Sequence, residues 1–269
     1  MVDLSVITIS HGHKDEVMRL YGSIFQRDWT VGLEFLLIDN LPPHRTAGAV
    51  QKVYPDVRII KNSRPHGFAY NANIGIRKTG GEFILLLNPD IIVLDGLFDR
   101  VVDFMRKHPE VGISGPMLLN PDGTRQPSAR SFPSIPVMIL RGLGLDSFFG
   151  NTSINSKYEL RHMESLNGFV KVDWITGAAM VIRRRAIEEV GLLDHKNFHL
   201  YFEDVDICYR MWKAGWEVAY IPDVKAIHEW KRRSAKHPFS IYKYYHVVSG
   251  LRFFKKYGLK LKNPREGKT

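Results

Sequence analysis

The chain has 269 residues, is 44% hydrophobic and carries a formal net charge of +10 at pH 7, with a pI near 9.6. This length and apolar content suffice for the core of one large α/β domain, with or without a small appendage, and they exclude a disordered chain. The single cysteine, Cys208, excludes an intramolecular disulfide framework, and its apolar setting predicts a buried thiol in a reducing compartment.

The positive charge predicts an anionic partner: nucleic acid, an acidic lipid surface or a nucleotide-linked substrate. Most of it lies near the end of the chain, where only Glu229 and Glu266 oppose the many basic residues after Lys225. The first residues run directly into a strand-like segment, and no uncharged apolar run approaches membrane-spanning length. We therefore expect a cytoplasmic protein that is neither exported nor integral to a membrane.

Strand and helix patterns alternate in the first half of the chain. Apolar runs predict buried strands, and apolar residues at helical spacing predict helices between or after them. The strands are predicted at residues 4–9, 33–39, 57–61 and 82–88, and the helices at residues 14–25 and 96–107. Such alternation is typical of a mostly parallel sheet covered by helices on both faces, an α/β architecture that binds nucleotides.

The second half begins with a segment rich in proline and polar residues, at about 120–166, which we interpret as an insertion over the site. Regular elements follow it. We predict a strand at 174–182, a helix at 204–214, short strands at 217–221 and 224–228 around a turn at 222–223, and a helix at 241–257.

The strand at 82–88 ends abruptly in Asn88-Pro89-Asp90. In α/β proteins, ligands bind at the carboxyl ends of the sheet strands. The carboxylate of Asp90 could there bind a divalent ion that bridges a diphosphate, because hard cations prefer oxygen ligands. The alternative is that Asp90 only caps a turn.

A segment around Gly67 places a glycine where a helix should start, followed by Asn71 and Asn73. Backbone and side-chain amides at such a position could bind the phosphates and hydroxyls of a nucleotide sugar. Alternatively, Gly67 makes a loop turn and the two asparagines cap the helix or face solvent. The segment matches no Walker or dinucleotide fingerprint.

Glu203 and Asp204 precede a predicted helix, where the helix dipole favours carboxylates and where they can also serve as caps. The functional interpretation makes Asp204 a general base for an acceptor hydroxyl. His228, at the end of a predicted strand, could bind a metal through a neutral imidazole, although a solitary histidine is more often structural.

Taken together and in order, these segments resemble the family 2 glycosyltransferases with a GT-A fold, and most closely the bacterial rhamnosyltransferase-like branch. The matching segments are residues 4–9, 37–40, 67–76, 86–90, 174–178, 202–206 and His228. The resemblance extends over nearly the whole chain to about His228. It implies a single GT-A domain at residues 1–235, followed by a basic, aromatic helical extension at 236–269.

The resemblance implies metal-assisted inverting transfer from a nucleoside-diphosphate sugar to a hydroxyl of a growing cell-surface glycan, with Mg²⁺ or Mn²⁺ as cofactor. Asp204 matches the catalytic base, and Asp90 and His228 match the metal and diphosphate site. The residues expected at the donor site are Ser10, Asp39, Gly67, Asn71, Asn73, Gly177, Glu203 and Lys231. Asp39 would contact the base or ribose, Gly177 would line the sugar pocket, and Lys231 would neutralise the diphosphate.

One departure from the wider fold affects the metal and the donor. Asn88 stands where many members have the first acid of an Asp-X-Asp motif, so weak or partly dispensable metal binding is expected. The rhamnosyltransferase-like branch commonly has the same Asn-Pro-Asp form, which favours dTDP-rhamnose over a UDP-hexose or UDP-N-acetylhexosamine as the donor.

Three alternatives remain at this stage. The same fold could use a UDP-sugar donor, or the chain could be a silent sugar-nucleotide-binding scaffold, although Asp204 and His228 argue against the latter. A nucleic-acid-binding module would leave Asp39, Asp90 and Asp204 unexplained, so we expect no nucleic-acid partner. The helix at 241–257 could pack on the domain, or lie on an anionic membrane at the inner face of the cell, where a lipid-linked acceptor would be found.

Overall fold

The computed structural model describes residues 1–142, 168–229, 241–259, 261 and 264, with side chains left out at 139–142. The helices in these ranges are α1 (Lys14–Phe25), α2 (Arg45–Val53), α3 (Phe68–Lys78), α4 (Leu97–Lys107), α5 (Ile135–Gly142), α7 (Arg184–Val190), α8 (Glu203–Ala214) and α9 (Ile241–Tyr257). The longer strands are β1 (Leu4–Ser10), β2 (Leu33–Asp39), β3 (Arg58–Lys61), β4 (Phe83–Leu87), β5 (Ile91–Val93), β6 (Val111–Leu119), β11 (Ala179–Arg183) and β12 (Glu217–His228). The two-residue strands are β7 (Arg125–Gln126), β8 (Ala129–Arg130), β9 (Val170–Lys171) and β10 (Trp174–Ile175).

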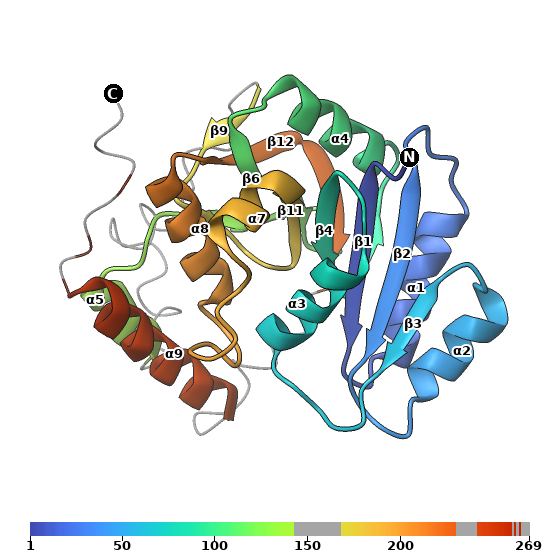
Figure 1. Ribbon diagram of the computed structural model, residues 1–269, viewed down its shortest axis with the longest axis horizontal. Helices are drawn as coiled ribbons and strands as arrows, with labels where there is room; N and C mark the ends of the chain where they lie inside the picture. Colours follow the sequence, from blue (N-terminus) through green and yellow to red (C-terminus); the bar gives the residue numbers. More distant parts are fainter. Residues whose placement is uncertain (143–167, 230–240, 260, 262–263, 265–269) are drawn as a thin grey trace.

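One mixed sheet forms the centre of the structure, in the strand order β3-β2-β1-β4-β11-β6-β12-β5 (Figure 1). β1 to β4 are parallel, as are β6 and β12, whereas β11 is antiparallel to both β4 and β6 and β5 is antiparallel to β12. The short strands β7 and β9 join β6 and β12, and β8 pairs with β10 in a separate two-stranded sheet. The predicted α/β fold with a mostly parallel central sheet is confirmed.

The alternation of side chains along β4 shows why this strand is apolar throughout. Ile84 and Leu86 face a core that includes residues of α3, α7 and α8, whereas Phe83, Leu85 and Leu87 face a second core with residues of α1 and α4. A strand covered on both faces has no polar side to present to water. The same covering explains the continuous apolar run that predicted this strand.

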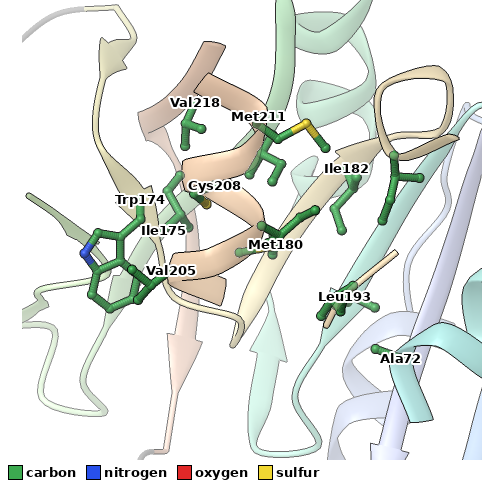
Figure 2. Packing of buried hydrophobic residues seen from close by; sticks show 14 of the residues in the cluster. Ala72, Trp174, Ile175, Met180, Ile182, Leu193, Val205, Cys208, Met211 and Val218 are labelled. Atoms are coloured by element: carbon green, nitrogen blue, oxygen red, sulfur yellow. The ribbon is translucent and has the colours of Figure 1, made fainter. Parts of the chain in front are cut away.

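The packing of α8 fixes the position of the two acids at its beginning. Figure 2 shows Cys208 and Met211 of this helix near Met180 of β11 and Val205 near Trp174, all members of one buried cluster. Cys208 is a free, fully buried thiol, as predicted. Burial of this helix face holds the first turn of α8 at the edge of the sheet where β4 ends.

Two predicted elements were wrong in extent. Residues 174–182 were predicted as one strand, but β10 and β11 belong to different sheets and are separated by residues 176–178, whose Thr176 N–H donates to the Ser128 carbonyl (2.9 Å). Residues 217–228 were predicted as two strands around a turn, but they form the single strand β12. Pro222, which has no N–H to donate, lies at an irregularity in the pairing with β6 rather than in a turn.

Helix α9 is part of the same packed structure as the sheet. Its Phe253 is fully buried in the α8 core, and the ring of Phe202 lies 5.6 Å from it. The boundary predicted at residue 235 lies outside the described residues. Among the helices that the structure describes, none is long and apolar enough to cross a membrane.

Candidate active site

The pairing of β5 with β12 brings Asp90 and His228 together. His228 lies opposite Ile91 in the register, and the Glu229 N–H donates to the carbonyl of Asp90 (2.9 Å). In this arrangement His228 Nε2 lies 3.3 Å from Asp90 Oδ1, with the imidazole 8% exposed and the carboxylate 22% exposed. The two residues assigned to the metal are therefore neighbours, although 138 positions separate them in the chain.

Gln126 determines which nitrogen of His228 faces Asp90. The Gln126 amide nitrogen donates to the His228 carbonyl (2.7 Å) and to Asn120 Oδ1 (2.8 Å), so its oxygen must face the imidazole. That oxygen lies 2.8 Å from His228 Nδ1, which therefore carries a proton. His228 Nε2 is buried, and the polar group of the described residues that it faces is the Asp90 carboxylate at 3.3 Å; once it carries no proton, this nitrogen can act as a metal ligand.

The electrostatics at Asp90 favour the ionised carboxylate. Burial alone would raise its pKa, but a hydrogen bond from protonated His228 and the positive charge of that imidazole, with a smaller effect of His13, lower the pKa below its ordinary value. A carboxylate and an imidazole nitrogen suit Mn²⁺, or Mg²⁺ completed by phosphate oxygens and water. No group of three or more His, Cys, Asp or Glu side chains within the described ranges could hold a metal, so a bound diphosphate would have to supply further ligands.

Asp204 lies in the first turn of α8, where two backbone amides hold its carboxylate. Oδ2 accepts from the Gly177 N–H (3.1 Å) and Oδ1 from its neighbour Val205 (2.9 Å). Burial raises the pKa of Asp204, and the two backbone hydrogen bonds offset only part of this rise. A half-buried, fixed carboxylate with a raised pKa fits a general base.

A short backbone path, made of two hydrogen bonds and the residues between them, connects Asp204 with the Asp90–His228 pair. β11 is antiparallel to β4, and the Asn88 N–H donates to the Ala178 carbonyl (2.8 Å). Ala178 follows Gly177, which binds Asp204, and Asn88 lies two residues before Asp90. Both carboxylates therefore lie at the carboxyl end of β4, where ligands bind in this class of sheet.

The turn that leads into α8 is strained. Tyr201 and Phe202 both have left-handed φ angles, 67° and 68°, which aromatic residues rarely adopt and which cost about 1–3 kcal/mol each. The ring of His246 on α9 packs against both aromatic rings, at 5.5 and 5.4 Å. Backbone strain that is maintained by surrounding packing is typical of functional sites. Here the strained turn sets the position of Glu203 and Asp204 at the start of α8.

Comparison with known proteins identifies the family of the chain. The sequence model of the family described as "Glycosyltransferase like family 2" matches residues 44–242. The chain belongs to this family. It is 29% identical over 219 residues to the N-acetylglucosaminyl-diphospho-decaprenol L-rhamnosyltransferase of Mycobacterium tuberculosis, covering 76% of this chain and 69% of that one. It is 26% identical over 233 residues to the rhamnosyltransferase WbbL of Escherichia coli K12, covering 83% and 82%.

Solved structures show the same fold at low sequence identity. GalNAc-T7 with UDP, GalNAc and Mn²⁺ matches with a TM-score of 0.62 at 17% identity, covering 85% of this chain and 44% of that one. The Pyrobaculum calidifontis mannosyltransferase PcManGT, in complex with GDP-Man and Mn²⁺, matches with a TM-score of 0.58 at 14% identity, covering 98% and 77%. The predicted GT-A fold is confirmed, and this glycosyltransferase has rhamnosyltransferases among its relatives.

Several residues expected at the donor site of the glycosyltransferase are instead bonded within the protein. Asp39 is 1% exposed, and its carboxylate accepts from the N–H of Ala47 (2.8 Å), which anchors the loop after β2. Ser10 is fully buried, and its hydroxyl bonds to the Thr46 hydroxyl (3.2 Å). In the described conformation neither side chain is open to a ligand, and their contacts with the donor stay predictions.

The two asparagines of α3 are structural as well. The Asn71 amide donates to the Gly67 carbonyl (2.9 Å) and accepts from Asn62 (2.6 Å), and Asn73 exchanges two hydrogen bonds with the backbone of Leu193 (2.8 and 3.0 Å). Both asparagines are buried and bonded within the protein, so their contact with phosphates or hydroxyls stays a prediction.

Three further predicted residues have different outcomes. A side chain at Gly67 would collide with the carbonyl oxygen of His199, so this glycine is required by a protein contact. At Gly177 an added Cβ would meet described atoms only at 3.6 Å and beyond, so packing does not require a glycine beside Asp204. Lys231 lies outside the described residues.

Glu203 is adjacent to Asp204 but differs from it in environment. It is 6% exposed, and its Oε2 is buried and makes no hydrogen bond within the part of the chain that the structure describes. Burial, and then the charge of Asp204, raise the pKa of Glu203 well above its ordinary value. The neutral acid is thus favoured, which suits a residue buried beside the base better than a contact with an anionic donor.

Proposed function

We propose that the protein transfers a rhamnosyl group from dTDP-rhamnose to a hydroxyl of a growing cell-surface glycan, with inversion at the anomeric carbon. The observation that carries this proposal is the short backbone path that joins the Asp90–His228 pair to Asp204 at one edge of the sheet. The rhamnosyl donor is supported by the two rhamnosyltransferase relatives and by the Asn88-Pro89-Asp90 sequence at the end of β4.

Asp204 is proposed as the general base. Its carboxylate takes the proton of the acceptor hydroxyl while the hydroxyl oxygen forms a bond to the anomeric carbon, and the bond from that carbon to the diphosphate oxygen breaks with both electrons. The amides of Gly177 and Val205 hold the carboxylate in one orientation during this transfer. Gly177 leaves space for the sugar beside Asp204, because it adds no side chain there.

Asp90 Oδ1 and His228 Nε2 are proposed to hold Mg²⁺ or Mn²⁺ together with the diphosphate of the donor. A bound divalent ion supplies positive charge that stabilises the departing diphosphate. Gln126 orients the imidazole, and Asp90 remains ionised because its pKa is low. With one carboxylate and one imidazole, we expect the affinity for metal to be low until the nucleotide is present.

The acceptor is proposed to be a lipid-linked sugar diphosphate. The name of the mycobacterial relative specifies an N-acetylglucosaminyl-diphospho-decaprenol acceptor. That protein and this chain align over most of their lengths.

A donor screen tests the proposal. The purified protein is incubated with a synthetic N-acetylglucosaminyl-diphospho-lipid and with dTDP-rhamnose, UDP-glucose, UDP-N-acetylglucosamine or GDP-mannose, and the product is analysed by mass spectrometry and NMR. We expect a rhamnosylated product of inverted configuration from dTDP-rhamnose alone, and none from Asp204→Asn. A product from a UDP-sugar only would assign a different donor, and a retained configuration would contradict the proposed displacement.

A further inference from the structure

The net positive charge of the protein belongs to its last forty residues. Residues 230–269 contain 12 of the 38 lysines and arginines but only one of the 28 acids, Glu266. The first 229 residues contain 26 basic and 27 acidic residues and are therefore nearly neutral. Four of these 12 basic residues lie on α9, namely Lys243, Arg252, Lys255 and Lys256, and would attract an anionic partner to this helix, whereas the first 229 residues contribute no net attraction.

The outward face of α9 is apolar. Ile241, Tyr244, Val247 and Leu251 are 56%, 60%, 37% and 63% exposed, and their spacing of three or four residues places them on one side of the helix. We call these four residues the α9 stripe. Of the nine large hydrophobic residues that are exposed in the described part of the chain, five lie between Ile241 and Leu259.

The opposite face of α9 is already occupied by the protein. Phe253 and Phe254 are buried, the Ser249 hydroxyl donates to the Leu200 carbonyl (2.9 Å), and Arg252 donates to the Asn197 carbonyl (2.8 Å). Near its end, Lys256 lies 2.7 Å from the buried carboxylate of Asp206. These contacts fix the orientation of the helix and leave the α9 stripe exposed. α9 itself lies at the edge of the molecule (Figure 1).

The charges beside the stripe identify the kind of partner. α9 contains no acidic residue, Lys243 lies beside the stripe, and Lys255 continues the same side of the helix one turn beyond Leu251. A single apolar stripe with basic flanks, on a helix too short and polar to span a bilayer, is typical of a helix that lies in the membrane interface. Anionic lipid headgroups attract lysines at such positions, because the surface of the bilayer is negatively charged.

We propose that α9 docks the protein on an anionic lipid bilayer, with the α9 stripe entering the interface and Lys243 and Lys255 contacting lipid phosphates. The inner face of α9 bonds to residues 197 and 200 and packs on Tyr201 and Phe202, which lead directly to Asp204. If the acceptor is lipid-linked, which rests on the proposed function, docking through α9 also holds the catalytic base near the plane where the acceptor is anchored.

Vesicle flotation tests the docking surface. The full-length protein is mixed with vesicles of phosphatidylcholine alone, or of phosphatidylcholine with phosphatidylglycerol, and the bound fraction is measured. The test variant is Tyr244→Glu/Leu251→Glu, whose sites are exposed, so the fold should tolerate the change. The matched control is Val53→Glu, at a residue of α2 that is 52% exposed and lies far from α9 in the fold.

We expect the wild type and Val53→Glu to float with the anionic vesicles, less so at high salt, and the double variant to bind at least about tenfold more weakly, since burial of one leucine alone is worth about that factor. Failure of the wild type to float, or equal binding by the double variant, would overturn the proposal. Stripe-dependent dimerisation without lipid binding, detected by light scattering, would assign the stripe to a second copy of the chain and would also overturn it.

Nucleotide binding, measured in the same samples without lipid, separates this proposal from the proposed function. The double variant should bind dTDP as the wild type does, because the stripe lies on the outer face of α9. Loss of vesicle binding with nucleotide binding intact supports the docking surface. Absence of nucleotide binding in the wild type would contradict the proposed function. It would not change what the flotation result says about the docking surface.

Discussion

Gln126 and His228 form a hydrogen-bonded pair in which the glutamine fixes the protonated nitrogen of the histidine. Gln126 Oε1 lies 2.8 Å from His228 Nδ1, and the glutamine amide nitrogen is held by the His228 carbonyl and by Asn120. His228 Nε2, the nitrogen that faces Asp90, is thereby left as the ligand atom. Partners of this kind orient metal-binding histidines and raise the affinity of the site.

Gln126→Ala should therefore weaken metal binding without touching either proposed ligand. We expect Mn²⁺ affinity, measured by electron paramagnetic resonance in the presence of dTDP, to fall about 10- to 100-fold. Asn120→Ala, which leaves the Gln126–His228 hydrogen bond in place, should change it by less than about threefold. The ¹⁵N shifts of His228 should show an Nδ1–H tautomer in the wild type only. Unchanged affinity in Gln126→Ala would contradict the positioning role.

Asp204→Asn should abolish most of the transfer while preserving the donor site. Loss of general base catalysis typically costs about 10²- to 10⁴-fold in kcat. The asparagine keeps an oxygen that can accept from Gly177, so we expect dTDP affinity by calorimetry to stay near the wild-type value. Activity within about tenfold of the wild type would show that another group removes the proton.

The pH dependence of kcat/KM should report Asp204. Because burial raises its pKa above the ordinary value of 3.8, the base becomes protonated, and the rate falls, at a less acidic pH than an exposed aspartate would give. The acid limb of the profile should therefore lie above pH 3.8. Circular dichroism across the same pH range verifies that the protein remains folded. An acid limb at or below the ordinary aspartate value would contradict the assignment.

Glu203→Gln should stabilise the protein, with a defined dependence on pH. The folded pKa of Glu203 is raised above its ordinary value of 4.5, so between these two values the folded state binds more protons than the unfolded state, and stability falls as pH rises. Glutamine removes this penalty. We expect the free energy of unfolding to rise at pH above the folded pKa and to change little below the unfolded pKa.

Thermal unfolding of Glu203→Gln and of the control Glu188→Gln, at an exposed position of α7, measures this effect. The control should show no such pH-dependent gain. A loss of stability in Glu203→Gln at high pH would mean that the ionised carboxylate is the favoured form.

Asp206→Ala should release α9 from the domain. The buried Asp206 carboxylate accepts from Arg210 (2.8 Å), Lys256 (2.7 Å) and Tyr257 (2.7 Å), which ties the last turn of α9 to α8. Removing one partner of a buried ionic group costs about 3–5 kcal/mol. The urea concentration at the midpoint of unfolding should therefore be lower for Asp206→Ala than for the wild type. The control Asp223→Ala, at an exposed position of β12, should leave this concentration nearly unchanged.

The sequence predicts those helices and strands in which burial sets the spacing of the apolar residues and in which turn or cap residues clearly mark the ends. The apolar run of β4 and the polar residues that follow it place Asp90 correctly at the sheet edge, and helical spacing places Asp204 in the first turn of α8. Strand β6 was missed because Gly112, Gly115 and Pro116 interrupt its apolar run. A Cβ at Gly115 would lie only 2.6 Å from Ile175 Cγ2, so packing between sheet layers requires this glycine.

The roles of polar residues were less predictable than the elements. Asn71, Asn73 and Asp39 look like ligand-binding residues in the sequence, but each satisfies buried backbone groups, a use that depends on partners distant in the chain. Gln126 was missed for the converse reason. It lies in a two-residue strand within a segment interpreted as an insertion, and its importance follows only from its contact with His228, 102 residues away.

Calorimetric titration of dTDP, UDP, GDP and ADP, with and without Mn²⁺, into the wild type and Asp90→Ala tests the central claim most directly. The account predicts that dTDP binds best, that Mn²⁺ strengthens its binding to the wild type, and that Asp90→Ala loses this strengthening while remaining folded. Failure of the folded wild type to bind any of the four nucleotides, or equal metal dependence in Asp90→Ala, would contradict it.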